Sequence, residues 1–479
     1  MNVSKYNFII ENKAYSNWLL YNSFRNSFLE VDYSVKRSLN LLNSNSDNNA
    51  ISDYEKEILE ENGFIIEDGF DELRYAKLRD EEVYNRLINR SNIVLTICPT
   101  YKCNLSCTYC FVHSDKQLTN FNYMNAEVQE NVVKLYHQYC LKYQSLHNLD
   151  NVEQDKITWY GGEPLLNINI INNVQNKINN IAKKFNRRIK RSIVTNGILL
   201  DRDNQKILKS NEIKLIQVTI DGPESIHNKR RFYPEFPDKS FNAIMTNLAD
   251  LDDYFNLIIR INVDKENSDY LRPLVDELEK WKIWPYRKKT KIILGPVLDC
   301  HKKKLNIFNY REFGSVYREF RKLQVLYYNS INPDSKAKFT LEFPSCLTNN
   351  RCTESFHKNG WIVGPAGDIY TCWENIGRKQ NCVGSLNTLL AKGNLKESEK
   401  LRIPSNYREK FGCYRCKLFP ICELNCMGEY WRTNKFNKNM CSKWKFTLTD
   451  TLLFNYNLQK LYPELTVLKG HDNEDIERL

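Results

Sequence analysis

The sequence predicts an α/β fold: a partial (β/α)6 barrel of the TIM type, with a small α+β module before it and a cysteine-rich domain after it. Strand-like and helix-like segments alternate from about residue 92 to residue 300, which is typical of βαβ units around a parallel sheet. Hydrophobic residues make up 42% of the 479 and can form a core. Most of the fifteen cysteines gather in two fields, one in the barrel and one after it.

Shifts in composition divide the chain into five segments. We expect an N-terminal module over residues 1–90, the barrel over 91–310, a helical connector over 311–340, a cysteine-rich domain with a C-terminal helix over 341–462, and a charged tail over 463–479. The cysteine-rich domain has little periodicity of its own, so we expect metal to hold it together.

The N-terminal module contains short apolar strands, two helices and a closing strand, which predicts a winged-helix-like fold. A polar loop at Asn43–Asn49 separates the helices, and Gly63 ends the second one. The strands are expected at Tyr6–Ile10, Trp18–Tyr21, Phe28–Val31 and Phe64–Glu67, and the helices at Val35–Leu42 and Ser52–Glu61.

The barrel segment contains six strand-like runs with amphipathic stretches between them. Six units are too few for a closed eight-stranded barrel, so we expect a partial one with ligands at the carboxyl ends of its strands. The strands are expected at Ile93–Cys98, Lys156–Tyr160, Ile189–Thr195, Lys214–Ile220, Leu257–Val263 and Lys291–Leu294. Helices are expected at Ala126–Tyr143, Ile168–Phe185, Asp269–Trp281, Tyr310–Tyr328 and Ser442–Tyr462.

Charge and targeting signals exclude several classes of protein. Lys and Arg exceed Asp and Glu by 69 − 58 = 11, an ordinary surface bias at this length that would also suit an acidic peptide partner. The sequence has no basic patch interleaved with aromatic residues, the pattern that would indicate a nucleic-acid partner. The start MNVSKYNFII has no secretory h-region, and no run of ~18 apolar residues indicates a membrane span. We therefore expect a cytoplasmic protein, in which clustered cysteines indicate metal rather than disulfides.

The first cysteine field is a short loop that directly follows the first barrel strand. Cys103, Cys107 and Cys110 form the pattern C-x3-C-x2-C. Three thiolates can hold three corners of a [4Fe–4S] cluster and leave one iron open to a substrate or cosubstrate. The alternative is a structural zinc site, for which His113 is near enough to be the fourth ligand.

This loop resembles the signature of the radical S-adenosylmethionine (SAM) superfamily, which has an aromatic residue, here Tyr109, before the third cysteine. Further along, Gly161-Gly162-Glu163-Pro164 resembles the glycine-rich segment after the second strand of that superfamily. The resemblance implies that this segment binds the amino group of SAM. Glycine suits such a place because a backbone can approach a ligand only where no side chain intervenes.

Other matches to the superfamily follow in order along the barrel. Thr195-Asn196-Gly197 ends the third strand and Thr219-Ile220-Asp221-Gly222-Pro223 ends the fourth. His227 and Arg231 complete a D-G-P…H…R pattern, in which Asn228 stands where an Asp is usual. The resemblance implies SAM contacts from Thr195, Asn196 and Thr219, and from Arg260 near the SAM carboxylate, which an Arg fork matches well. The alternatives are turn chemistry at residues 195–197 and a surface ion pair for Arg231.

The second cysteine field resembles the SPASM domain, a C-terminal extension of radical SAM enzymes that modify peptides and proteins. Eight thiolates suffice for two fully ligated [4Fe–4S] clusters, and the alternative is a pair of zinc knuckles. The resemblance implies that auxiliary cluster I takes Cys346, Cys352, Cys372 and Cys426, and that auxiliary cluster II takes Cys413, Cys416, Cys422 and Cys441. The four remaining thiols, expected to be ordinary core or surface residues, are Cys98, Cys140, Cys300 and Cys382.

The resemblance implies an enzyme with three [4Fe–4S] clusters and SAM, reduced by an external donor such as flavodoxin or ferredoxin. Such enzymes cleave SAM reductively to a 5′-deoxyadenosyl radical that abstracts hydrogen from an unactivated carbon, while the protein positions that carbon. The SPASM pattern and the N-terminal module together predict a maturase of a ribosomally synthesised precursor peptide. The module would bind the leader of the precursor as an added strand, and the product would be a thioether or a carbon-based crosslink.

Two other functions compete with this one. An anaerobic sulfatase maturase forms formylglycine, but those enzymes begin close to the cysteine loop and carry an Asp directly after the equivalent of Cys372, where this chain has Trp373 and then Glu374. A non-catalytic peptide-binding adaptor would not need the intact cysteine loop. No catalytic acid or base can be assigned, and His227, Trp373 and Glu374 are candidates for the substrate pocket only.

Overall fold

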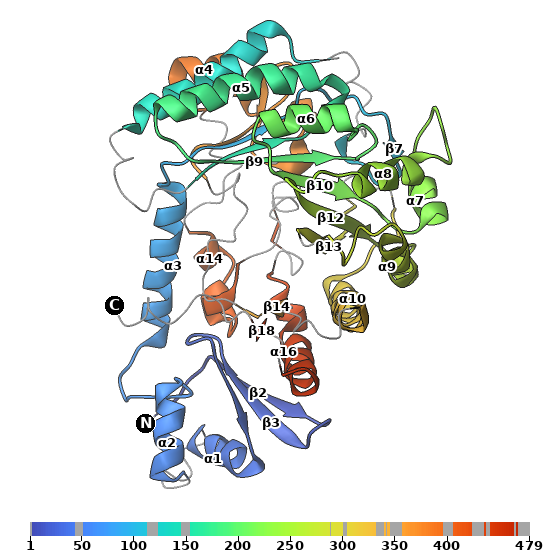
Figure 1. Cartoon of the computed structure of the whole chain (residues 1–479). Coiled ribbons are helices and arrows are strands. Elements are labelled where there is room, and N and C mark those ends of the chain that lie inside the picture. The colour runs from blue at the N-terminus through green and yellow to red at the C-terminus, as the bar shows by residue number, and fades with distance from the viewer. Residues whose placement is uncertain are drawn as a thin grey trace. The chain divides into compact units, whose positions relative to one another are not determined.

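In the computed structural model, the chain forms two compact units (Figure 1). Unit 1 contains residues 1–87, 310–351 and 404–479, and unit 2 contains residues 88–309 and 352–403. The structure describes residues 2–43, 51–112, 123–144, 154–287, 289–299, 304–331, 340–341, 343–344, 357–395, 406–423, 435–436, 441–463 and 466–467.

Unit 2 is built on a sheet in which six parallel strands stand in their chain order. This neighbour-to-neighbour order is that of a (β/α)6 partial barrel, and the six predicted strands are confirmed to within two residues at each end. The strands are β6 (Val94–Ile97), β8 (Asp155–Trp159), β9 (Ile189–Thr195), β10 (Leu215–Thr219), β12 (Asn256–Val263) and β13 (Thr290–Pro296).

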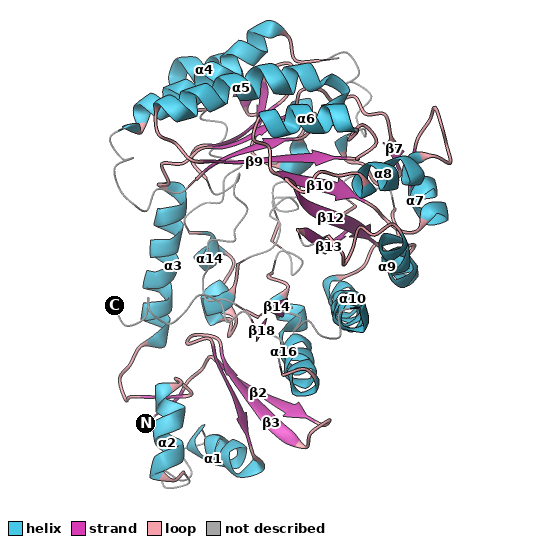
Figure 2. Cartoon of the chain, viewed as in Figure 1, coloured by secondary structure: helices cyan, strands magenta, loops and turns pink. Residues whose placement is uncertain are grey.

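Helices between these strands cover the outer face of the sheet (Figure 2). In β12, burial alternates strictly, so that Leu257, Ile259 and Ile261 pack under the helices while Arg260 and Asn262 share the inner face. The helices are α4 (Ala126–Lys142), α5 (Ile168–Lys184), α6 (Arg202–Ser210), α7 (Glu224–Arg230), α8 (Ser240–Ala249) and α9 (Leu271–Lys280).

A seventh parallel strand comes from the cysteine-rich region, whose sequence shows no periodicity. The strand β15 (Gly360–Val363) pairs with β6, and the antiparallel strands β16 (Asp368–Tyr370) and β17 (Gly384–Ser385) extend that edge. All four residues of β15 are buried, so it lacks the alternation that identifies a strand in a sequence. Helix α12 (Leu386–Lys392) follows β17.

In unit 1, the N-terminal residues form the antiparallel sheet of β2 (Asn7–Asn12), β3 (Asn17–Asn22) and β4 (Ser27–Val31). The strand β1 (Asn2–Val3) pairs separately with β5 (Ile65–Ile66). The helices are α1 (Tyr33–Asn43), α2 (Asp53–Glu61) and α3 (Glu72–Ile88), of which α3 was not predicted. Helix α2 begins with a capping box, in which Ser52 and Glu55 each bond the backbone of the other.

The C-terminal part of unit 1 shares a core with this sheet. Helix α16 (Trp444–Leu461) lies beside α10 (Tyr310–Ile331), and both were predicted. Leu19 and Tyr21 of β3 pack in one cluster with Trp444 and Leu452 of α16 and with Ile421. The first and last segments of the sequence are therefore folded together. The strands β14 (Thr340–Leu341) and β18 (Thr466–Val467) form a small parallel pair, and no described helix is long and apolar enough to cross a membrane.

Candidate active site

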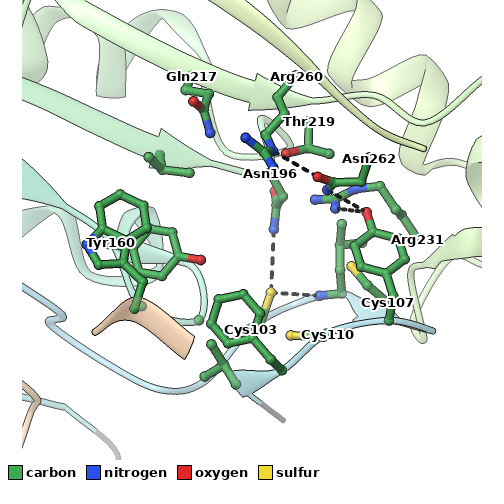
Figure 3. A pocket seen from close by; sticks show the side chains of 18 of the residues that line it. Cys103, Cys107, Cys110, Tyr160, Asn196, Gln217, Thr219, Arg231, Arg260 and Asn262 are labelled. Atoms are coloured by element: carbon green, nitrogen blue, oxygen red, sulfur yellow. Dashed lines mark hydrogen bonds between the residues drawn. The ribbon is translucent and has the colours of Figure 1, made fainter. Parts of the chain in front are cut away.

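The parallel strands of unit 2 end at a cavity of about 350 Å³. Three cysteines of the predicted loop line it, together with the glycine pair and residues from the ends of β9, β10 and β12 (Figure 3). Cys103, Cys107 and Cys110 lie along one wall, and Asn196, Thr219 and Arg260 lie opposite them. The cavity is at the carboxyl edge of the sheet, as expected for an α/β fold.

Backbone pairing holds the cysteine loop in place. The strand β7 (Ser106–Cys107) pairs with β11 (Arg231–Phe232), which puts Arg231 opposite Cys107. The sulfur of Cys103 accepts the backbone N–H of Leu105 at 3.4 Å and the side-chain amide of Asn196 at 3.7 Å. Burial raises the pKa of the Cys107 thiol to about 11, although the charge of Arg231 opposes this shift. Thiols in such a place lose their protons most readily when metal binds them.

The donor groups around the loop fit a [4Fe–4S] cluster. Among the described residues, no three His, Cys, Asp or Glu side chains converge closely enough to hold a single metal ion. The three thiols instead surround a cavity, and His113 lies outside the described residues. The Nδ2 of Asn104 and the Nε of Arg231 are buried without a hydrogen-bond partner in the described part of the chain. Such donors suit the sulfur atoms of an anionic cluster.

Tyr109 connects the loop to two strand ends through its hydroxyl group. This hydroxyl donates to the carboxylate of Asp221 and accepts from Nη1 of Arg231 at 2.8 Å and from Nδ2 of Asn262 at 3.2 Å. Asp221 is fully buried and also accepts the backbone N–H of Asn262 at 3.0 Å. Because these groups are satisfied by one another and shielded from water, they fix the position of the loop.

The two glycines of the G-G-E-P segment pack against the backbone that leads into the cysteine loop. Gly162 donates its N–H to the carbonyl of Thr100 at 3.1 Å, and a Cβ on Gly162 would lie 2.0 Å from the carbonyl oxygen of Lys102. Gly161 has a φ of +121°, and its Cβ would lie 2.5 Å from the oxygen of Thr100. Close approach of two backbones therefore requires glycine at both positions.

Glu163 and Pro164 do not line the cavity, contrary to our expectation of cofactor contacts. The carboxylate of Glu163 is fully buried and accepts hydrogen bonds from the hydroxyl of Thr195 and the backbone N–H of Asn196, both at 2.7 Å. Burial raises the pKa of Glu163, and these hydrogen bonds counteract the rise. Glu163 thus ties the glycine segment to the end of β9. Pro164 begins the short helix η4 (Pro164–Asn167) behind that segment, because proline suits the first helical position.

Arg260 presents an uncommitted guanidinium fork to the cavity. Its Nε donates to Oδ1 of Asn262 at 2.8 Å, and its two Nη groups have no hydrogen-bond partner within the described residues. A Cβ at Gly295 on β13 would lie 2.1 Å from Nη2, so glycine leaves the space that the fork occupies. This arrangement suits the carboxylate of a bound SAM molecule. Thr195, Asn196 and Thr219 line the same cavity, and their contacts with SAM stay a prediction.

A pair of aromatic side chains borders the cavity on another side. Trp373 and Glu374 lie on the short helix η6 (Trp373–Asn375), and both line the cavity. The rings of Tyr160 and Trp373 are 4.4 Å apart, centroid to centroid. Glu374 carries the one carboxylate among the described residues that line the cavity. Both pocket candidates from this segment therefore line the same cavity as the three loop cysteines, and their contact with a substrate stays a prediction.

The third pocket candidate, His227, does not line the cavity. Its ring is fully buried, accepts the backbone N–H of Asp221 through Nδ1 at 3.3 Å and packs edge-on against Phe241. Burial and, to a lesser extent, the neighbouring Arg231 and Arg230 lower the pKa of this ring. The D-G-P…H pattern therefore encodes a support for the turn that carries Asp221.

Among the residues with polar side chains that line the cavity, sequence reasoning missed four: Tyr160, Gln217, Asn262 and, as more than a surface ion pair, Arg231. Period-two spacing would have found two of them, because Asn262 follows Arg260 by two positions and Gln217 precedes Thr219 by two, which puts each pair on one face of its strand. Arg231 is buried rather than exposed, and no local sequence signal indicates that.

Four further cysteines line a second, smaller cavity of about 90 Å³ in unit 1. They are the set assigned by resemblance to auxiliary cluster II: Cys413, Cys416, Cys422 and Cys441. Burial raises the pKa of Cys413 to about 12. For auxiliary cluster I, Cys372 is buried in unit 2, whereas Cys346, Cys352 and Cys426 lie outside the described residues, so that cluster stays a prediction.

Of the four cysteines expected to bind no metal, Cys98 and Cys140 are fully buried and Cys382 donates to the carbonyl of Gly384. Cys300 lies outside the described residues.

Comparison with known proteins supports the resemblance to the radical SAM superfamily. The model of the Radical SAM superfamily matches residues 97–278. The cysteine-type anaerobic sulfatase-maturating enzyme of Clostridium novyi is 25% identical over 361 residues, covering 68% of this chain and 84% of its own. The radical SAM cyclopropyl synthase TigE of Paramaledivibacter caminithermalis is 23% identical over 480 residues, covering 92% of this chain and 94% of its own. A solved structure of native anSMEcpe with bound AdoMet and Kp18Cys peptide shares the fold, with a TM-score of 0.52, 18% identity, and coverage of 77% of this chain and 98% of that one.

The contact at Gly162 predicts a specific defect. Gly162→Ala would force the backbone at Lys102 away and shift the cysteine loop, and a displacement of about 1 Å in reacting geometry can cost ~100-fold in rate. We expect SAM cleavage by the reconstituted variant, measured as 5′-deoxyadenosine formed under dithionite, to fall by tenfold or more. The control is Gly69→Ala, because no atom lies within 4 Å of the Cβ position of Gly69. Equal rates for the two variants would contradict the packing argument.

Proposed function

The chain is a radical SAM superfamily enzyme, and we propose that it installs a thioether or carbon-based crosslink in a ribosomally synthesised precursor peptide. The observation that carries the proposal is the N-terminal antiparallel sheet, which leaves a strand edge open for a leader peptide. Support also comes from the extent of similarity, because the radical SAM cyclopropyl synthase TigE aligns with 92% of this chain and the sulfatase-maturating enzyme with 68%.

The open edge follows from the hydrogen-bond alternation of the sheet. The backbone N–H of Ser23 donates to the carbonyl of Tyr6, which fixes the bonded pairs between β2 and β3 at alternate residues. The bonded pairs between β3 and β4 must then include Leu29, and the backbone groups of Phe28 and Glu30 point away from β3. Among the described residues, no backbone partner meets these two N–H groups. A leader strand can pair with them.

In the cavity, bound SAM and a reduced [4Fe–4S] cluster would supply a carbon-centred radical that abstracts a hydrogen atom. Cys103, Cys107 and Cys110 hold the cluster, and Arg260 holds the carboxylate of SAM. Trp373 and Glu374, which border the same cavity, orient the substrate side chain beside the cofactor. We extend the proposal to two closed auxiliary clusters and to an external donor such as flavodoxin or ferredoxin.

Formylglycine formation is the second candidate, because several relatives are sulfatase-maturating enzymes and anSMEcpe shares the fold. The cavity argues against it. The position after Cys372, where those enzymes carry an Asp, holds Trp373, whose ring packs on Tyr160.

An anaerobic co-expression separates the two functions. A short Cys- or aromatic-containing open reading frame beside the gene is expressed with the enzyme, and a Cys-containing sulfatase peptide is offered in a parallel reaction. We expect the neighbouring peptide to lose two hydrogen atoms by mass spectrometry and the sulfatase peptide to stay unchanged. Conversion of the sulfatase Cys to an aldehyde, with no change in the neighbouring peptide, would overturn the proposal.

If the leader binds at β4, precursor processing should require the outward backbone groups of β4 and not those of β2. Glu30→Pro removes an outward N–H without breaking the ladder to β3, since proline is tolerated on edge strands. We expect it to abolish precursor processing and to leave uncoupled SAM cleavage intact. Glu11→Pro, at an outward position on β2, is the matched control, and Glu30→Gln controls for the ion pair of Glu30 with Lys460. Equal processing by both proline variants would exclude β4 as the leader site. Deletion of residues 1–88 is a poorer test, because it would expose the core shared with α16.

If Arg260 binds the carboxylate of SAM, its replacement should weaken SAM binding. A hydrogen bond to a charged group is worth about 1.5–3 kcal/mol, so Arg260→Gln should weaken SAM binding ~10- to 100-fold. Anaerobic calorimetry on the reconstituted protein measures this affinity. The control is Arg272→Gln, which lies exposed on α9 and should bind SAM normally. Normal affinity in Arg260→Gln would remove Arg260 from the SAM site.

A further inference from the structure

A fully buried arginine lies in the wall of the four-cysteine cavity of unit 1. Arg408, on the short helix α14 (Tyr407–Lys410), has no exposed surface, and its guanidinium lies over the ring of Phe419 at 4.9 Å. Its Nε and Nη2 both bond the carboxylate of Asp80, at 3.0 and 2.9 Å, and Nη2 also donates to the carbonyl of Cys422 at 2.8 Å.

The remaining nitrogen of this guanidinium has no acceptor. Nη1 of Arg408 is buried, and within the described residues no group accepts a hydrogen bond from it. A buried charged donor left in this state is costly, so native structures usually provide it with a partner. Arg408 lines the cavity that the four thiols surround, and an occupant of that cavity is therefore the natural acceptor.

The charges around the cavity indicate an anionic occupant. Its described lining includes Arg408 and Lys445, the latter with Nζ 3.5 Å from the sulfur of Cys441, and no carboxylate. Four thiolates around a [4Fe–4S] cluster carry a net negative charge that increases on reduction. Two cations in the lining would stabilise the reduced form more than the oxidised form.

We propose that Arg408 is a positioning residue that donates Nη1 to a [4Fe–4S] cluster held by the four cysteines and raises its reduction potential. The inference rests on the proposed assignment of auxiliary cluster II to this cavity. Asp80 keeps the guanidinium in place and joins the cluster site to α3, the helix that ends the N-terminal module. Ser23 and Lys417 add a second link, since the hydroxyl of Ser23 donates to the carbonyl of Lys417 at 2.5 Å. A cluster in this cavity is thereby connected to the module that we propose binds the leader.

The test is an electron paramagnetic resonance redox titration of the full-length reconstituted protein. The signal of auxiliary cluster II is the one that disappears in the double variant Cys413→Ala/Cys416→Ala. We expect the equilibrium constant for reduction of this cluster to be about tenfold lower in Arg408→Gln than in the wild type. This corresponds to a shift of its reduction potential by about 59 mV to a more negative value. Arg408→Lys keeps the positive charge but not the guanidinium fork. We expect the reduction potential of its cluster to lie between those of the wild type and Arg408→Gln.

The matched control is Arg318→Gln on α10. Arg318 also pairs with a carboxylate, Asp450, and also has a buried Nη1 without a partner in the described residues, but it does not line the cavity. Its replacement should leave the potential unchanged. An unchanged potential in Arg408→Gln, or a shift equal to that of Arg318→Gln, would overturn the proposal. If Arg408→Gln fails to retain the cluster, Arg408→Lys decides: a more negative potential supports the proposal, and a wild-type potential overturns it.

The iron content of the variants distinguishes absence of the cluster from failure of the role proposed for Arg408. If Cys413→Ala/Cys416→Ala binds as much iron as the wild type, the cavity holds no cluster and both proposals fail. If the double variant loses about four irons while Arg408→Gln keeps them at wild-type potential, the cluster stands and only the role of Arg408 fails.

Discussion

The close contact between the glycine pair and the backbone before the cysteine loop is the constraint on which the catalytic cavity depends. Gly161 and Gly162 approach the carbonyls of Thr100 and Lys102 so closely that no side chain fits between them. The buried carboxylate of Glu163 then links the same segment to the end of β9 by hydrogen bonds. One tetrapeptide thus sets the distance between the cluster ligands and the strand ends that face them. The G-G-E-P motif has a steric role in the fold in addition to the cofactor contact implied by resemblance.

In unit 1, a buried ion pair lies beside the other cysteine site. A buried ion pair is a weak source of net stability, but loss of one partner is severe because the other charge stays buried. Arg408 and Asp80 form such a pair beside four thiols, and Leu19 and Tyr21 of the N-terminal sheet pack against α16 nearby in the same unit. The sheet that we propose binds the leader and the second cysteine site are therefore parts of one folded unit, which gives the proposed maturase a physical reason to carry both.

Periodicity was sufficient to predict the six parallel strands and most helices, because their apolar residues recur at the spacing of one buried face. The spacing of the three loop cysteines predicted a cluster site, and resemblance supplied Arg260. The failures have physical causes: β15 is buried on both faces and so shows no alternation, and His227 carries a functional residue type but serves a structural contact with the backbone of Asp221. The burial of Arg231 and the tether role of Glu163 depend on contacts between distant segments, which no local pattern contains.

The central claim is that this chain removes a hydrogen atom from a carbon of a peptide held at its cavity. Deuterium transfer tests it most directly. The neighbouring short peptide is prepared with fully deuterated side chains and incubated anaerobically with the reconstituted enzyme, SAM and dithionite, and the 5′-deoxyadenosine formed is analysed by mass spectrometry. We expect the nucleoside to gain one deuterium from the peptide in step with modification of the peptide. A modified peptide with unlabelled 5′-deoxyadenosine would contradict it.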